Sequence, residues 1–273
     1  MVRQAAVAGK FYTSDPDELR QELEQMLPQR ESSLPEGEAG RPLGIVAPHA
    51  GYLYSGKVAG SIYGAIAVPD TVLILGPNHT GIGAPAALWP SGQWLTPLGP
   101  VPVSSRLSKL ILKHAHQVRE DVSAHRFEHS LEVQLPFLQY RNPRVSIAAL
   151  CVSLSDFDSI TRMGEGIARA ISEYGEQVLM VASSDMTHYE SARAARAKDD
   201  LALAQVAALN PEALLKVCRE KDITMCGVIP TAVMLVAAKA LGATQSRLVS
   251  YATSGEVNGD LQRVVGYAAV TVS

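Results

Sequence analysis

Three histidines in this sequence each follow an apolar run and lie in a loop of small and polar residues. They are His49 after residues 43–46, His79 after residues 71–75, and His188 after residues 177–182. Apolar runs of this length are typical of strands buried in a parallel sheet. Open α/β sheets build binding sites where such strands end, so these imidazoles could be metal ligands or acid/base groups. A single histidine after a strand is more often a hydrogen-bonded structural residue, and the pattern alone leaves both interpretations open.

Two further reactive side chains lie in comparable loops. Asp185 precedes His188 by three residues, and its carboxylate can accept an imidazole N–H and so fix the tautomer of a general base. Cys226 stands just before an apolar helix, where backbone N–H groups and the helix dipole favour thiolate over thiol. Two imidazoles and one thiolate can form a three-point metal site with open positions, which makes His49, His79 and Cys226 candidate ligands.

The segment 127–136 carries another acid and another histidine. His129 and Glu132 are three residues apart, so on a helix their side chains would project side by side. Such a pair at the start of a helix is either a cap or surface pair, or a pair that faces a ligand. We treat both residues as candidate substrate-binding residues.

Apolar runs and helical patterns alternate through most of the chain, and this order predicts an α/β fold. We expect a single domain over residues 1–273, with a central mostly parallel sheet flanked by helices. Near the start, Asp15 and Pro16 have the types preferred at the N-cap and first position of a helix. Residues 28–42 are rich in Pro, Gly, Glu and Ser and predict an exposed connection, because too little chain precedes them to fold alone.

Composition limits the classes of partner. The 273 residues are 47% hydrophobic and 19% charged with a net charge of −3, so no basic surplus exists to bind nucleic acid or an anionic membrane. No signal peptide or membrane-spanning apolar run is apparent, and we expect a cytoplasmic protein whose partner is a small molecule or another protein. Three cysteines are too few for a disulfide framework. We expect Cys151, in an apolar run, and Cys218, in a solvated helix end, to be chemically silent.

Several motifs together resemble one known family. They are AGKFYTSD near the start, then APHAGYLYSG, LGPNHTG, EHSLEVQLPF, SSDMTHY, CGVIP and, at the C-terminus, GYAAVTV. In this order they resemble the Memo (mediator of cell motility) family, including the bacterial AmmeMemoRadiSam system protein B. The resemblance runs from about residue 5 to the C-terminus. It implies a fold similar to that of class III extradiol dioxygenases of the LigB type, which are non-haem iron enzymes that cleave catechol rings.

The resemblance also implies roles for individual residues. His49 and His79 match the two histidine ligands of those dioxygenases, and His188 matches their acid/base histidine, with Asp185 beside it. Cys226 stands where the dioxygenases have a carboxylate, a departure that separates Memo-like proteins from true dioxygenases. The remaining match is to aromatic residues at the mouth of the Memo pocket, which are Phe11 and Tyr54 here.

Two classes of function follow from these observations. The first is a metal-dependent redox enzyme that uses one iron(II) or copper ion, or zinc, on a small oxygen-rich substrate, with His188 moving a proton. The second is a non-catalytic protein that holds a peptide or a phosphotyrosine side chain in the same pocket. The family name further implies an AMMECR-type protein and a radical SAM protein as partners.

Overall fold

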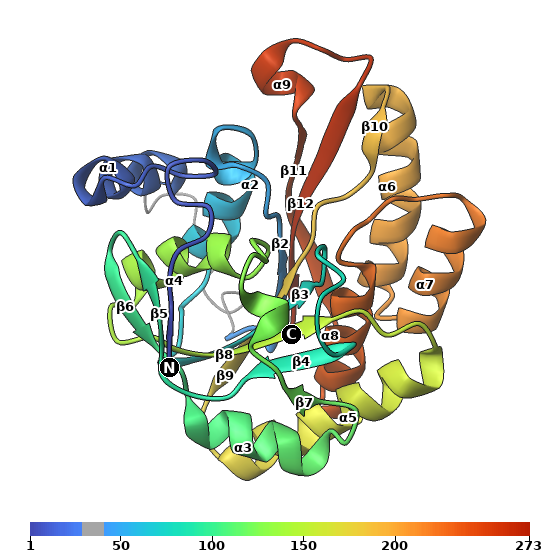
Figure 1. The fold of residues 1–273 in the computed structure, drawn as a ribbon. Helices are drawn as coiled ribbons and strands as arrows, with labels where there is room; N and C mark the ends of the chain where they lie inside the picture. The colour runs from blue at the N-terminus through green and yellow to red at the C-terminus, as the bar shows by residue number, and fades with distance from the viewer. Residues whose placement is uncertain (29–40) are drawn as a thin grey trace.

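Four of the apolar runs form the centre of one sheet. β2 (Gly44–Ala47), β9 (Val178–Ser183), β3 (Thr71–Pro77) and β8 (Ser146–Val152) lie side by side in that order, and each neighbouring pair is parallel. In this computed structural model, which describes residues 1–28 and 41–273, every residue of β2, β3 and β9 is buried. The predicted α/β fold with a mostly parallel central sheet is confirmed (Figure 1).

Antiparallel strands complete both sides of the parallel centre. β12 (Val264–Val272) pairs with β2, and β4 (Ala86–Trp89) pairs with β8. Beyond them, β12 also pairs with β10 (His188–Glu190) and β11 (Ser246–Thr253), and β4 pairs with β7 (Arg119–Glu120). β11 and β12 form a long hairpin, with the short helix α9 (Gly255–Asn258) at its tip (Figure 1).

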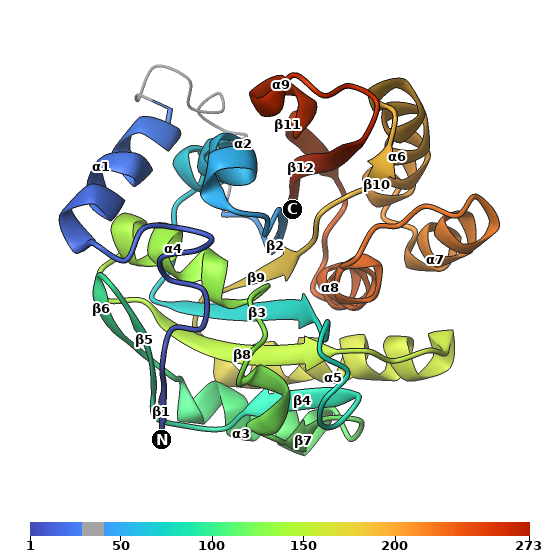
Figure 2. The same ribbon diagram turned by 45° about the horizontal axis from the view of Figure 1, so that its top comes forward.

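Helices cover both faces of the sheet, so alternate residues of each central strand pack into different apolar clusters. On β3, Leu73 and Leu75 belong to one cluster, and Val72 and Ile74 belong to the other. Figure 2 shows α2 and α4 on one side of the central strands and α8 on the other. The helices that contribute to the first cluster are α3 (Ser105–His114), α5 (Phe157–Tyr174), α6 (Ala192–Ala207), α7 (Pro211–Glu220) and α8 (Val228–Ala240), and those of the second are α1 (Pro16–Met26), α2 (Tyr52–Ala65) and α4 (Leu135–Arg141).

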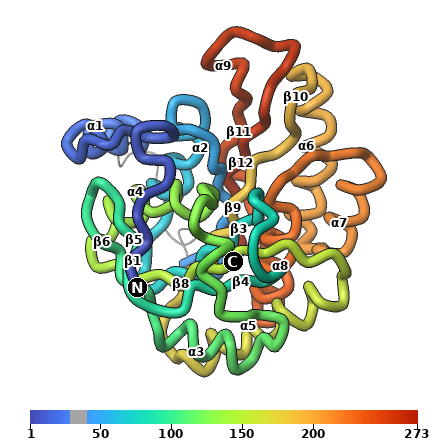
Figure 3. The backbone as a smooth tube through the Cα atoms, in the orientation of Figure 1, coloured from blue at the N-terminus to red at the C-terminus, as the bar shows by residue number. Residues whose placement is uncertain are grey.

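The N-terminal segment belongs to a second, smaller sheet. β1 (Val2–Arg3) pairs in parallel with β5 (Gln93–Thr96), which pairs with β6 (Gly99–Pro102). The chain then runs past α4 to α1, as the tube in Figure 3 shows. α1 begins where the sequence predicts, because the Asp15 carboxylate accepts hydrogen bonds from the Asp17 and Glu18 N–H groups, each at 2.9 Å.

Three expectations need correction or lie outside the described residues. The segment that carries His129 is irregular until a 3₁₀ turn at Glu132–Gln134, and α4 begins only at Leu135. Cys218 is buried, with 6% of its surface exposed, rather than solvated. Most of the predicted connection at 28–42 lies outside the described residues. Among those described, no helix is both long and apolar enough to cross a membrane.

Candidate metal centre

The register of the central sheet explains why distant loops meet at one edge. Ala47 of β2 lies opposite Ser183 of β9, and Leu75 of β3 lies opposite Ala182. Because these parallel strands end level with one another, the residues that follow them gather at the same edge. That edge receives His49 after β2, His79 after β3 and the loop after β9.

Three histidines converge at this edge. His49, His79 and His129 each place a ring nitrogen so that the three atoms lie within 4.8 Å of one another. The rings of His79 and His129 stack with centroids 4.7 Å apart, and His49 stands edge-on to both. The group can therefore hold one metal ion. His129, which the sequence suggested as a substrate-binding residue, lies beside the two predicted ligands because its loop returns to the end of β3.

The thiol of Cys226 reaches the same centre. Its Sγ lies 3.2 Å from Nε2 of His49 and accepts a hydrogen bond from the Asp185 N–H at 3.3 Å. Burial raises the pKa of this thiol, and the neighbouring Asp185 carboxylate raises it further. The helix position that predicted a thiolate is thus outweighed by burial, so Cys226 is a neutral thiol without metal and needs a cation to release its proton.

The tautomer of His49 follows from its neighbours. Ser183 Oγ has one proton and lies 2.6 Å from the Ser130 carbonyl oxygen, which can only accept, and it also accepts from Gln134. The 3.0 Å contact between His49 Nδ1 and Ser183 Oγ must then have the imidazole as donor. Burial lowers the pKa of His49, so the ring is neutral. Its Nε2 lone pair therefore faces Cys226 and the centre.

Glu128 anchors the other two histidines. Its carboxylate accepts from the His79 backbone N–H at 2.7 Å and contacts His79 Nδ1 at 2.9 Å. The same carboxylate lies 3.4 Å from His129 Nδ1 and accepts from the Ser130 N–H. Contacts with His79 and Ser130 hold the pKa of Glu128 at about 2 despite its burial. An ionised carboxylate that fixes the Nδ1 side of a histidine leaves Nε2 available to a metal.

His188 lies at the start of β10, and its hydrogen bonds define which of its ring nitrogens can accept a proton. Its Nδ1 lies 2.9 Å from the Thr224 carbonyl oxygen, which can only accept, so Nδ1 carries the proton and Nε2 has the lone pair. The backbone N–H of His188 donates to Thr224 Oγ1 at 2.7 Å. Thr224, rather than the predicted Asp185, is the hydrogen-bond partner that orients this imidazole.

Asp185 instead fixes the loop that carries His49. Its Oδ1 accepts from the His49 N–H at 2.7 Å and from the Ala50 N–H at 3.3 Å. Burial raises the pKa of this carboxyl to about 6, while these hydrogen bonds and the charge of His188 act in the opposite direction. Asp185 therefore lies next to the His49 loop, but its carboxylate bonds to the backbone of that loop rather than to the His188 ring.

Glu132 does not share a face with His129, because the 3₁₀ turn directs its carboxylate inward. The carboxylate is fully buried and accepts from Arg3 at 2.6 Å, from the Ala6 and Val7 N–H groups and from the Tyr12 hydroxyl. All of these donors belong to the N-terminal segment. Glu132 thus fastens that segment to the domain and has no oxygen left for a substrate.

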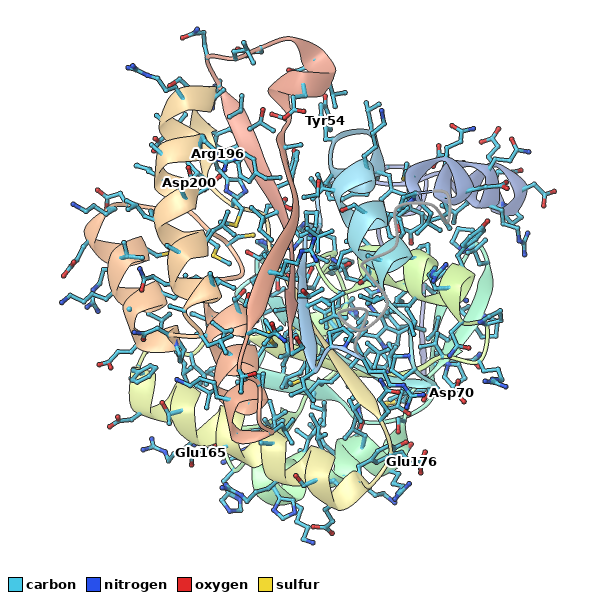
Figure 4. The ribbon with its side chains drawn as sticks, turned by 180° about the vertical axis from the view of Figure 1, so that it is seen from behind. Tyr54, Asp70, Glu165, Glu176, Arg196 and Asp200 are labelled. Atoms are coloured by element: carbon cyan, nitrogen blue, oxygen red, sulfur yellow. The ribbon has the colours of Figure 1, made fainter. Side chains whose placement is uncertain are left out.

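The two predicted aromatic residues lie at different distances from the centre. The ring of Phe11 packs on His129 with centroids 4.8 Å apart, so it covers one side of the histidine group. Tyr54 is 37% exposed near the start of α2, and Figure 4 shows it close to the tip of the β11–β12 hairpin. Burial is the main cause that raises the pKa of Tyr267, and Tyr54 is near enough to that phenol to add to the effect.

Sequence reasoning missed the residues that hold the candidate ligands in place. Glu128, Ser183, Thr224 and Gln134 act through hydrogen bonds to histidines or to one another. Only Glu128 gave a usable signal, as an acid directly before a histidine. The others are common polar residues whose roles depend on which strands become neighbours.

The fold and the centre define an α/β protein with a candidate metal site at the carboxyl edge of its sheet. The family profile described as Memo-like protein matches residues 3–271, and the chain belongs to this family. MEMO1 family proteins of Methanopyrus kandleri and Pyrobaculum aerophilum are each 41% identical to it, over 99% and 98% of this chain and 98% of each relative. One of Aquifex aeolicus is 40% identical over 97% of both chains.

A solved structure supports the fold independently. The crystal structure of an uncharacterized protein from Escherichia coli K12 matches 85% of this chain and 100% of its own, with a TM-score of 0.57. At 13% sequence identity, this likeness concerns the fold alone.

Proposed function

We propose that this protein is a metal-dependent redox enzyme with one non-haem metal ion held by His49, His79 and Cys226. The observation that carries the proposal is the approach of the Cys226 Sγ to within 3.2 Å of Nε2 of His49, which is itself one of the three grouped histidines. Two imidazoles and a thiolate suit iron(II), copper or zinc. Three protein donors leave open positions, as catalytic metal sites require.

His129 is the alternative to Cys226 as the third metal ligand. The set His49, His79 and His129 is compact, and it shares two members with the set that contains Cys226. The thiolate that remains when Cys226 loses its proton carries a negative charge. It stabilises a bound cation more than the neutral imidazole of His129 does. We therefore assign Cys226 to the metal and His129 to the wall of the substrate pocket, beside Phe11.

The remaining residues have roles in proton transfer and exclusion of water. When bound, the metal supplies Lewis acidity toward substrate oxygens and a path for electrons. His188 accepts a proton from a substrate hydroxyl at Nε2, because Nδ1 is already bonded to the Thr224 carbonyl. Phe11 and the N-terminal segment cover the histidine group and limit access of water. A small diol or catechol fits this set of roles.

The charges of the pocket weigh against the alternative of a phosphotyrosine-binding protein. Glu128 is ionised, because its contacts with His79 and Ser130 hold its pKa at about 2 despite its burial. This negative charge lies beside His79 and His129 and repels a phosphate dianion. The observations favour the enzyme.

Metal content tests the proposed ligands. Protein purified anaerobically should contain one metal ion per chain, and His49→Ala, His79→Ala and Cys226→Ala should each lose it on dialysis against a weak chelator. Elemental analysis measures the content, and circular dichroism checks that each variant is folded. His129→Ala should keep most of its metal, and His116→Ala, which alters an exposed histidine, is the control. Retention of metal by all three ligand variants, or loss only in His129→Ala, would contradict the assignment.

Glu128→Gln tests the anchoring of His79. Glutamine keeps the size of the side chain but removes the charge. Its NH₂ group is a donor and cannot accept a hydrogen bond from the backbone N–H of His79 or Ser130 that it would face. We expect metal affinity to fall by about 10- to 100-fold, as is typical when a partner of a ligating histidine is lost. Competition with a chromophoric chelator measures it. Glu165→Gln, on the exposed face of α5, is the matched control, and equal affinities in both variants would exclude the role of Glu128.

A further inference from the structure

A second cavity lies apart from the histidine centre. Its volume is about 720 Å³, and residues 2–6 and Lys10 form one wall. Trp89, Val122, Arg126 and Phe127 form the other. None of the three grouped histidines lines this cavity, and neither do His188, Asp185 and Cys226. The proposed catalytic chemistry therefore gives it no role.

The lining of this cavity is cationic and apolar. Lys10 and Arg126 have no ion-pair partner within residues 1–28 and 41–273, and no carboxylate is among the residues that line the cavity. Arg3 also lines it, but Glu132 neutralises that guanidinium. Phe127 is 64% exposed and Val122 is 39% exposed. Unpaired cations next to exposed apolar side chains suit a ligand that carries both carboxylates and apolar groups.

One wall of the cavity is the free edge of a strand. β1 pairs only with β5 among the described strands, and Gln93 N–H donates to the Met1 carbonyl oxygen. In a parallel ladder alternate residues direct both backbone groups to the same neighbour, and Val2 is in register with Gln93. The N–H and C=O of Val2 therefore point away from β5. Val2 is 52% exposed, so these groups are available to another strand.

We propose that this cavity binds an extended acidic peptide segment of a partner protein, which adds to the free edge of β1. Backbone hydrogen bonds to Val2 give the segment its direction, because strand addition uses main-chain groups on an exposed edge. Acidic side chains of the segment pair with Lys10 and Arg126. Its apolar side chains pack against Phe127 and Val122. The cavity is a docking site next to the N-terminal segment, which in turn covers the histidine centre through Phe11.

Fluorescence anisotropy with a labelled, end-blocked hexapeptide of alternating Glu and Val tests this proposal on the full-length protein. We expect saturable binding that weakens at high salt, and about tenfold weaker binding for Lys10→Glu and for Arg126→Glu, equivalent to about 1.4 kcal/mol each. The control Lys221→Glu, at an exposed lysine outside the cavity, should bind as the parent does. A hexapeptide of alternating Lys and Val should not bind.

A proline substitution separates strand addition from simple charge attraction. Val2→Pro removes the N–H that points away from β5 and leaves the bonds to β5 intact. We expect several-fold weaker binding of the Glu–Val peptide, with metal content unchanged. Absence of saturable binding below about 1 mM, or binding by the Lys10→Glu and Arg126→Glu variants that is as tight as binding by the parent, overturns the site. Equally tight binding of N-acetylglutamate overturns the assignment to a peptide.

Discussion

His188→Ala is expected to keep its metal and to lose turnover by about 10²- to 10⁴-fold, the usual effect of removing an acid/base group. Thr224 holds the imidazole on its Nδ1 side. Neither of these hydrogen bonds joins His188 to a proposed metal ligand. Its Nε2 lone pair has no other described partner. A screen of catechols and related diols for oxygen uptake supplies the substrate, and steady-state rates on that substrate measure the loss.

The metal content of the same variant separates two roles for His188. If the residue moves a proton, metal occupancy in His188→Ala equals that of the parent while turnover falls. If occupancy falls as far as in His49→Ala, His188 is a ligand. His114→Ala, at a histidine paired with Glu173 on the protein surface, controls for nonspecific effects and should leave the rate unchanged.

Glu132→Ala is expected to lower the free energy of unfolding by about 3–5 kcal/mol, because it leaves the buried Arg3 guanidinium without its counter-charge. The side chains of the pair are 2% and 0% exposed, and three other N-terminal donors lose the same acceptor. For a chain of 273 residues the loss corresponds to a fall in melting temperature of about 5–9 °C. Urea unfolding followed by circular dichroism measures the change.

An exposed ion pair provides the control for this experiment. Glu176, whose side chain is 63% exposed, pairs with Arg106. Glu176→Ala should change the free energy of unfolding by less than about 1 kcal/mol. Glu132→Gln keeps the size of the side chain and should fall between Glu132→Ala and the parent. A loss in Glu132→Ala no larger than in Glu176→Ala would show that the N-terminal segment does not depend on this carboxylate.

The strands and helices could be predicted because each leaves a local pattern. Continuous apolar runs marked β2, β3, β8 and β9, and a proline after an N-cap residue marked the start of α1. The position of candidate ligands at strand ends followed directly. Strand order could not be predicted, because nothing local states that β9 lies between β2 and β3.

The details of the centre depend on contacts between segments far apart in the chain. Glu132 looked like the partner of His129 because helical spacing was assumed where the chain forms a 3₁₀ turn. Asp185 looked like the partner of His188 because the two are close in sequence, whereas the actual partner is Thr224, 36 residues away. Burial likewise reversed the expected effect of a helix start on the Cys226 thiol. Proximity in sequence therefore located the centre but not its hydrogen bonds.

The place of β9 in the sheet has a consequence for the order in which the protein is made. His49 and His79 follow strands that are close in sequence, yet these strands meet only through β9, which ends at Ser183. A nascent chain that has passed residue 150 on the ribosome carries both histidines but cannot yet bring their loops to one edge. Cys226 emerges later still. On the proposed ligand assignment, the metal site is therefore complete only after residue 226 has been made.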